Sequence, residues 1–283
     1  MKRILITGAR GMLGRALMEQ RPGKYEVLGV DVEELDVTSL PDVRRCFADF
    51  GPDCVIHCAA MTDVDGCETH RARAIAINAM ATLDLARECA ARHVPMVYVS
   101  TDFVFDGQKR EPYTEHDPSH PIGLYGWTKE RGEFYTRHFL PPHYIVRTAW
   151  TFAPWGHNFV RSILRNARER PELRVVDDQL GSPTYAPDLA EGLWSLIATG
   201  AYGTYHMTNQ GVVSRYDFAR EILAAAGLSH VPVVAIKSAE LNQPAKRPAY
   251  SALANTKLPP LRPYREALAD CLARLGGSDL EAH

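Results

Sequence analysis

An α/β fold built on a doubly wound parallel sheet is the fold class that this 283-residue sequence predicts. Short apolar runs alternate with segments of helical composition through the first half of the chain. The apolar runs are continuous, as in parallel strands that are buried on both faces. Because crossovers between parallel strands are right-handed, the connecting helices are expected to cover both faces of the sheet.

The predicted elements follow one another from the N-terminus. Strands are expected at residues 4–7, 25–31, 54–58, 95–100 and 144–147, and helices at 12–20, 39–50 and 72–93, with one more before the fifth strand. Ser39 can cap the second helix, Pro41 suits its first turn, and Gly51 follows its end.

After about residue 150, loops rich in proline and glycine separate shorter elements. Ser214 can cap a helix that ends near Gly227, and the tail at 276–283 is expected to fray. We expect residues 1–150 to form the sheet domain. Residues 151–283 are expected to form a smaller lobe, with some segments returning to the sheet domain.

The composition excludes several classes of protein. Charged residues make up 23% of the chain and the net charge is −2, which gives no electrostatic reason to expect nucleic acid or a membrane as a partner. The six cysteines form no CxxC pair, so we expect free thiols in a reducing compartment and no metal site. The N-terminus shows no signal peptide and no segment has 18 consecutive apolar residues, so a soluble, cytoplasmic protein is expected.

Three glycines between the first strand and the first helix predict a dinucleotide-binding turn of the Rossmann type. Gly8, Gly11 and Gly14 follow the spacing GxxGxxG. The first allows a tight turn, the second lets a pyrophosphate approach the backbone, and the third lets helix and strand pack closely. Free N–H groups at the start of the helix then face the anion.

The sequence leaves NAD and NADP open as the cofactor. Asp31 ends the second strand about 20 residues after the glycines, where a carboxylate can bind the adenosine ribose of NAD. Arg10, beside the glycine turn, can instead pair with the 2′-phosphate of NADP. Asp36, followed by Val37, is placed where it can contact the adenine amino group.

Tyr125 and Lys129 predict a proton donor for carbonyl reduction. They stand at i and i+4, so on a helix they share one face. A free tyrosine has a pKa near 10, and a nearby ammonium lowers that pKa toward the working pH. Lys129 can also hold the nicotinamide ribose. Ser100 and Thr101, at the carboxyl end of the fourth strand, are candidates for holding the substrate carbonyl.

Together these elements resemble the extended short-chain dehydrogenase/reductase superfamily, and further motifs resemble its dTDP-4-dehydrorhamnose reductase family. Residues 58–65 with Glu68 are similar to the family's NAAxTxVDxxE loop, and residues 100–107 to its STDYVFDG signature. More matches follow in order at 147–150, 158–159, 178–184, 203–206 and 245–248. The resemblance covers nearly the whole chain.

The resemblance implies NAD(P)H-dependent reduction of the C4 keto group of dTDP-4-dehydro-L-rhamnose (dTDP-6-deoxy-L-lyxo-4-hexulose) to dTDP-L-rhamnose. The implied catalytic residues are Thr101, Tyr125 and Lys129. Cofactor-binding residues are expected to be Gly8, Arg10, Gly11, Met12, Leu13, Gly14, Asp31, Asp36, Val37, Ala59, Ala60, Thr62, Ser100, Tyr125 and Lys129. Substrate-binding residues are expected to be Val64, Thr101, Phe103, Trp150, Asn158 and Arg247.

Three departures from the family pattern stand out. Phe103 replaces a usual tyrosine, and Gly123 a usual asparagine. Some relatives carry a glutamate after the glycine turn that is linked to magnesium and a dimer interface, but here Arg15 and Ala16 occupy that stretch. No metal is therefore carried over, and a homodimer is left open.

Two other functions remain open. One branch of the resembled family serves as a non-catalytic regulatory subunit of methionine adenosyltransferase. An epimerase or dehydratase of the same superfamily is the second. A dehydratase would want a carboxylate pair beside the tyrosine, but Asp102 is followed by Phe103 rather than by a second acid.

Overall fold

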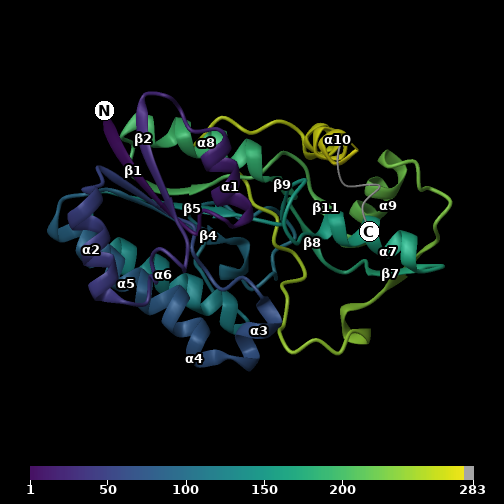
Figure 1. Ribbon diagram of the computed structural model, residues 1–283. Helices are drawn as coiled ribbons and strands as arrows, with labels where there is room; N and C mark the ends of the chain where they lie inside the picture. The colour runs from purple at the N-terminus through teal and green to yellow at the C-terminus, as the bar shows by residue number, and fades with distance from the viewer. Residues whose placement is uncertain (277–283) are drawn as a thin grey trace.

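The computed structural model describes residues 1–276 and is built around a six-stranded parallel sheet. In spatial order its strands are β10 (Gly203–His206), β5 (His143–Thr148), β4 (Met96–Thr101), β3 (Cys54–His57), β1 (Lys2–Thr7) and β2 (Tyr25–Val30). From β1 the chain winds to β2 at one edge and then through β3, β4 and β5 to the other side (Figure 1). The predicted doubly wound parallel sheet is therefore confirmed.

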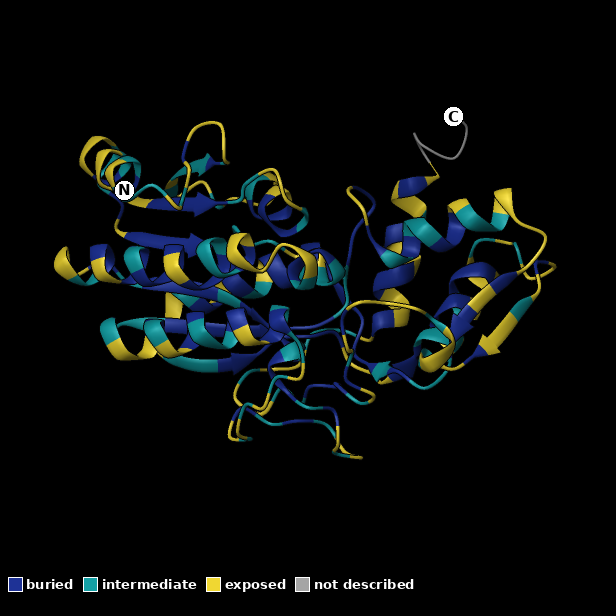
Figure 2. Cartoon of the chain, turned by 90° about the horizontal axis from the view of Figure 1, so that it is seen from below, coloured by how far each residue is buried: buried dark blue, intermediate teal, exposed yellow. Residues whose placement is uncertain are grey.

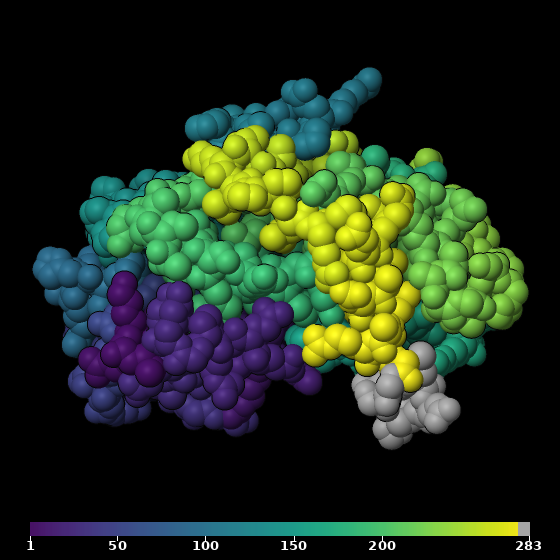
Figure 3. All heavy atoms as spheres, turned by 90° about the horizontal axis from the view of Figure 1, so that it is seen from above, coloured from purple at the N-terminus to yellow at the C-terminus, as the bar shows by residue number. Residues whose placement is uncertain are grey.

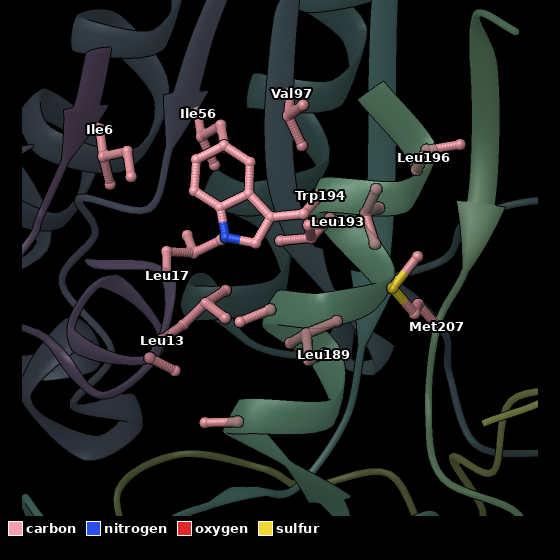
Figure 4. Close-up of a cluster of buried hydrophobic side chains, with 14 of the residues drawn as sticks. Ile6, Leu13, Leu17, Ile56, Val97, Leu189, Leu193, Trp194, Leu196 and Met207 are labelled. Carbon is pink, nitrogen blue, oxygen red and sulfur yellow. The ribbon is translucent and has the colours of Figure 1, made fainter. Parts of the chain in front are cut away.

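One face of the sheet is covered by α1 (Met12–Glu19) and α8 (Ala186–Thr199). Figure 4 shows how their side chains meet over the sheet, with Leu13 and Leu17 on α1, Leu189, Leu193 and Trp194 on α8, and Ile6, Ile56 and Val97 on the strands. Helix α8 and strand β10 both lie after residue 150 in the chain, yet they belong to this layer and to this sheet.

The other face is covered by α2 (Leu40–Phe50), α5 (Ala81–Ala91) and α6 (Leu124–Phe139). Figure 2 shows the buried strands between helices whose outer surfaces are exposed. The predicted caps of α2 are confirmed. The Ser39 side chain accepts a hydrogen bond from the Asp42 N–H, and Gly51 follows the helix with a φ of 59°.

The single helix predicted at 72–93 is interrupted by a π-helical stretch. The structure has α4 (Arg71–Ala74), then the π-helix η1 (Ile75–Met80), then α5. The Asn78 carbonyl accepts hydrogen bonds from the side chains of Thr82 and Tyr98. The Asn78 amide binds the backbone of Met61, beyond the end of β3. The contacts with Met61 and Tyr98 join this stretch to other elements, and helix propensity does not reveal them.

A second hydrophobic core lies in the lobe at the right of Figure 1. It is built by α7 (Phe159–Glu169), α9 (Arg215–Ala225), α10 (Tyr264–Leu275) and the parallel pair β7 (Leu173–Val176) and β12 (Val233–Ile236). The Ser214 side chain caps α9 as predicted. In Figure 3 the yellow C-terminal residues cross the middle of the visible face.

The remaining elements are short. They are α3 (Val64–Thr69), η2 (Asp102–Val104), β6 (Thr151–Phe152), β8 (Leu180–Gly181), β9 (Thr184–Tyr185), β11 (Val213–Ser214) and η3 (Ser238–Glu240). Within residues 1–276, no helix is both long and apolar enough to span a bilayer. Apart from Gly276, the tail predicted to fray lies outside the described residues.

Candidate active site

The glycine turn lies where the winding of the sheet reverses direction, between β1 and β3. Gly8 follows β1 with a φ of 69°, and a Cβ added there would lie 2.7 Å from the backbone nitrogen of Ala59, which follows β3. Only glycine allows the two loops to approach so closely. In open α/β sheets, ligands bind outside the carboxyl ends of the strands at such a switch point.

The turn is shaped to accept a pyrophosphate. A Cβ on Gly14 would lie 2.1 Å from the Gly8 carbonyl oxygen, so the start of α1 is pressed against the turn. Gly11 precedes α1 without capping it, and the first turn of α1 carries no acidic residue. The N–H groups of Met12 and Leu13 at this helix start are therefore available to an anion. These residues fit a bound dinucleotide.

Both predicted recognition residues for the adenosine end lie beside this turn. The Asp31 carboxylate accepts a hydrogen bond of 2.9 Å from the Arg10 backbone N–H. The Arg10 guanidinium, predicted to meet a 2′-phosphate, pairs instead with the carboxylates of Glu33 and Glu34. A 2′-phosphate at this position would have to compete with both glutamates for the guanidinium.

Asp36 is exposed and holds a turn, and its carboxylate accepts two hydrogen bonds from Thr38. These hydrogen bonds lower the pKa of Asp36. Val37 is half-buried beside it and packs against the core under α2. The position of Asp36 near the end of β2 is compatible with the predicted adenine contact.

Thr101 and Tyr125 meet at the carboxyl end of β4. Burial raises the pKa of the Tyr125 phenol, and a hydrogen bond with the Thr101 side chain offsets part of that rise. The Thr101 hydroxyl donates its proton to Asp102, at 3.0 Å, so its oxygen is an acceptor toward the phenol. The Phe103 ring meets the Tyr125 ring edge-on, with centroids 5.6 Å apart. Tyr125 therefore keeps its proton at neutral pH, as the predicted role of proton donor requires.

Lys129 is buried one helical turn further along α6. Its Nζ lies 4.2 Å from the centroid of the Tyr98 ring. Burial lowers the pKa of Lys129 to about 8. At the end of β3, burial lowers the pKa of His57 to about 3 and raises that of Cys58 to about 12, and in both groups the charge of Lys129 acts to lower the pKa. Within residues 1–276 the ammonium has no hydrogen-bond or ion-pair partner. The Lys129 ammonium is thus free to bind ligand hydroxyls. The predicted lowering of the Tyr125 pKa by Lys129 is not seen, because burial raises that pKa and Thr101 is the group that offsets part of the rise.

Two glycines inside α6 bring these side chains to the sheet. A Cβ on Gly126 would lie 2.0 Å from the Phe103 carbonyl oxygen, and one on Gly132 would lie 2.1 Å from the Tyr98 hydroxyl. Glycine in a helix interior costs stability, so its presence there signals close packing.

Glu68 makes a contact with the start of α6 that was not predicted. Its carboxylate accepts a hydrogen bond of 2.6 Å from the Leu124 N–H and compensates for the missing side-chain cap at Gly123.

A buried ion pair fixes α6 behind the proton donor. Glu133, one turn after Lys129, accepts two hydrogen bonds from the Arg147 guanidinium of β5. Burial raises the pKa of Glu133, but the Arg147 contacts outweigh it and the pKa is lowered. The Ser100 hydroxyl donates to the same carboxylate at 2.6 Å. Ser100 was predicted to bind the cofactor, and its hydroxyl is directed toward Glu133.

Asp102 joins the segment after β4 to the lobe. Besides the Thr101 hydroxyl, its buried carboxylate accepts a 2.5 Å hydrogen bond from the Ser251 hydroxyl. Burial raises the pKa of Asp102 to about 6 against these hydrogen bonds. The orientation of Thr101 therefore depends on a residue that is 150 positions later in the chain.

Trp150 begins the lobe side of the site. It is half-buried, has a φ of 45°, and lies against Gly181, where a Cβ would be 2.4 Å from the indole. A positive φ is strained for a bulky residue, and such strain is found preferentially at functional sites. The Arg215 guanidinium lies over the indole at 3.5 Å from the ring centroid.

The other predicted substrate-binding residues make structural contacts. Asn158 caps α7, because its Oδ1 accepts from the Arg161 N–H while its Nδ2 donates to two backbone carbonyls. Arg247 holds Asp65 with both terminal nitrogens, at 3.2 and 2.8 Å. Val64 begins α3 directly beside this ion pair. In the same segment, Ala59 and Ala60 are half-buried and Thr62 is exposed.

Comparison with known proteins agrees with this geometry. The model of the family described as RmlD substrate binding domain matches residues 1–276. A curated dTDP-4-dehydrorhamnose reductase of Aggregatibacter actinomycetemcomitans is 41% identical over 271 residues, which cover 91% of this chain and 92% of that protein. The chain belongs to this family. The resemblance inferred from the sequence motifs is confirmed.

Two solved structures of family members have the same fold. A dTDP-4-dehydrorhamnose reductase of Clostridium acetobutylicum is 41% identical, with a TM-score of 0.94 over 97% of this chain and 99% of that chain. The enzyme of Bacillus anthracis, solved in complex with NADP, is 36% identical, with a TM-score of 0.93 over 97% of this chain and all of that chain. The similarity thus includes the lobe as well as the sheet.

Proposed function

We propose that the chain reduces the C4 keto group of dTDP-4-dehydro-L-rhamnose to the hydroxyl of dTDP-L-rhamnose, with NADPH or NADH as the reductant. The observation that carries the proposal is the hydrogen-bonded pair of Tyr125 and Thr101, beside a buried Lys129 that has no counter-ion in the described part of the chain. About 40% identity to curated reductases supports the choice of substrate.

Each catalytic side chain has one task. The dinucleotide is held by the glycine turn and by the loop after β3, and when bound it supplies the hydride. Lys129 binds the ribose hydroxyls next to β3. Tyr125 holds a proton at its phenol oxygen and passes it to the alkoxide oxygen that develops at C4. Thr101 keeps the phenol oriented through its own bond to Asp102.

The lobe residues bind the other end of the substrate in this proposal. Trp150 packs against the sugar, and Phe103 closes the same region without offering a hydroxyl. The C-terminal segment that carries Ser251 and Arg247 contacts the sheet domain at Asp102 and Asp65. We propose the lobe beyond residue 150 as the substrate-binding part of the enzyme.

The test is turnover by the purified protein. With dTDP-4-dehydro-L-rhamnose and NADPH or NADH, absorbance of the reduced nicotinamide should fall and dTDP-L-rhamnose should form. Tyr125→Phe should lower kcat by roughly 10²–10⁴-fold, because the proton donor is gone while the ring remains. Its NADPH affinity should match the wild type. Activity that survives this change would show that another group donates the proton, and no turnover with either cofactor would refute the function.

A further inference from the structure

Arg215 is a guanidinium at the site for which neither the sequence motifs nor the proposed mechanism has a role. It begins α9, and its backbone N–H is fixed by the Gln179 carbonyl at 3.1 Å. Its guanidinium carbon lies 3.5 Å from the centroid of the Trp150 ring and 4.9 Å from that of the Phe159 ring. A guanidinium held over aromatic rings keeps its N–H groups available to other acceptors.

The positive charge of Arg215 is not neutralised by an ion pair. Within residues 1–276 no carboxylate lies within 4.0 Å of its guanidinium, and its side chain donates no hydrogen bond. Burial lowers the pKa of Arg215 to about 10, while the charge of Asp102 raises it and that of Arg247 lowers it. Asp102 already accepts hydrogen bonds from Thr101 and Ser251. A half-buried guanidinium in this state is costly unless a ligand supplies the partner.

The nearby Arg247, unlike Arg215, has an ion-pair partner within the protein. Both of its terminal nitrogens bind the Asp65 carboxylate, and one of them also donates to the Ala245 carbonyl. Its guanidinium N–H groups are therefore largely occupied by acceptors within the protein. The two arginines are close enough for each charge to act on the other, so together they favour an anion between α9 and the segment around residue 247.

We propose that Arg215, held over the Trp150 ring, is a principal ligand for the diphosphate of the nucleotide-sugar substrate. This inference rests on the proposed function, which supplies a substrate with a diphosphate beside the sugar. Since Trp150 is the proposed sugar contact, a guanidinium on its face is next to the point where the sugar joins the phosphates. Its edge can bind two phosphate oxygens at once. Arg247 then contributes mainly charge and the ion pair that holds the segment.

The experiment measures binding of thymidine 5′-diphosphate and of thymidine by calorimetry, so it does not depend on turnover. Arg215→Met keeps an unbranched side chain on the indole but removes charge and donors. It should weaken diphosphate binding by about 10- to 100-fold and leave thymidine binding unchanged. Arg215→Lys should recover part of the loss, because it restores charge without the planar fork.

Arg220→Met is the matched control. Arg220 lies on the same helix and is exposed, and among residues 1–276 its one recorded side-chain contact is with the Tyr216 ring, at 5.6 Å. This change should leave diphosphate affinity, NADPH affinity and melting temperature at wild-type values. Melting temperature and NADPH affinity also show whether Arg215→Met is folded.

The proposal is overturned if folded Arg215→Met binds thymidine diphosphate within twofold of the wild type, if thymidine binding falls equally, or if the wild type binds no thymidine diphosphate. In turnover assays the substitution should raise KM and leave kcat nearly unchanged. A wild-type protein that binds the diphosphate through Arg215 but does not reduce the keto-sugar would refute the proposed function and leave this site intact.

Discussion

In the sheet domain the site is formed by backbone segments that approach one another at glycines, whereas in the lobe it is formed by side chains from distant parts of the sequence. Gly8 admits the loop after β3, and Gly126 admits the loop after β4. On the lobe side, Arg247 reaches Asp65 and Arg215 reaches Trp150. The proposed cofactor-binding half therefore depends mainly on glycines that let backbone segments approach, and the proposed substrate-binding half on contacts between side chains.

This difference predicts how each half fails. Adding one methyl group should disrupt the sheet half, because the neighbouring backbone cannot move away cheaply. Removing one charge from the lobe half should cost less, because its ion pairs are partly exposed.

The largest effect is expected from Gly126→Ala. The new Cβ would lie 2.0 Å from the Phe103 carbonyl, so α6 must shift away from Thr101 and carry Tyr125 with it. A displacement of about 1 Å costs roughly 10²-fold in kcat, and overpacking costs about 1–3 kcal/mol of unfolding free energy. Steady-state kinetics and urea unfolding measure both. Gly23→Ala is the control, since a Cβ there meets nothing within 4 Å. Equal behaviour of the two variants would contradict the close-approach explanation.

The pH dependence of activity tests Lys129. Burial lowers its pKa to about 8, and the protonated form is the one that binds hydroxyls as a full cation. The kcat/KM should therefore be retained below pH 8 and fall about tenfold per pH unit above it. Tyr125 does not produce this limb, because its pKa is raised above the usual value. Lys129→Met should have lower activity and lack the limb. A wild-type profile that stays flat to pH 9.5 would exclude the assignment.

A smaller effect is expected on the lobe side from Asp65→Asn. It breaks the two-pronged contact with Arg247, whose side chain is 19% exposed, so about 1 kcal/mol of unfolding free energy should be lost. Glu240→Gln is the control, because its pair with Arg174 lies at the surface of the lobe. Denaturant unfolding of both variants measures the difference. If Asp65→Asn lost as much unfolding free energy as Gly126→Ala, the predicted difference between the sheet domain and the lobe would be wrong.

The smallest effect concerns the choice of cofactor. Replacing Glu33 and Glu34 together by glutamine should free the Arg10 guanidinium and strengthen NADPH binding by a few-fold, with little change for NADH. All three side chains are exposed, so the gain should shrink at high salt. Glu26→Gln, an exposed glutamate on β2, is the control. Equal gains for both cofactors would show that Arg10 does not meet a 2′-phosphate.

Sequence reasoning succeeded where local chemistry decides the structure. The glycine spacing placed the turn between β1 and α1, and Ser39 and Ser214 were identified as caps. It was less successful over residues 72–93, where a π-helical stretch that contacts Tyr98 on β4 interrupts the helix. Gly126 could have been noticed as a glycine inside a helix. The sequence around it does not predict, however, that Phe103 lies against it.

The layered fold, the glycine turn and the tyrosine–lysine pair could be inferred from the residues alone, because periodicity, glycine conformation and helical spacing act within a few residues of the chain. Which polar groups remain available depends on how the chain folds. The tertiary structure committed Ser100 to Glu133 and Arg247 to Asp65, and it left Arg215 and Lys129 without an anionic partner among the described residues. A donor or acceptor is used up by whichever group it meets in the folded chain, so the groups that stay free cannot be predicted from one segment of sequence.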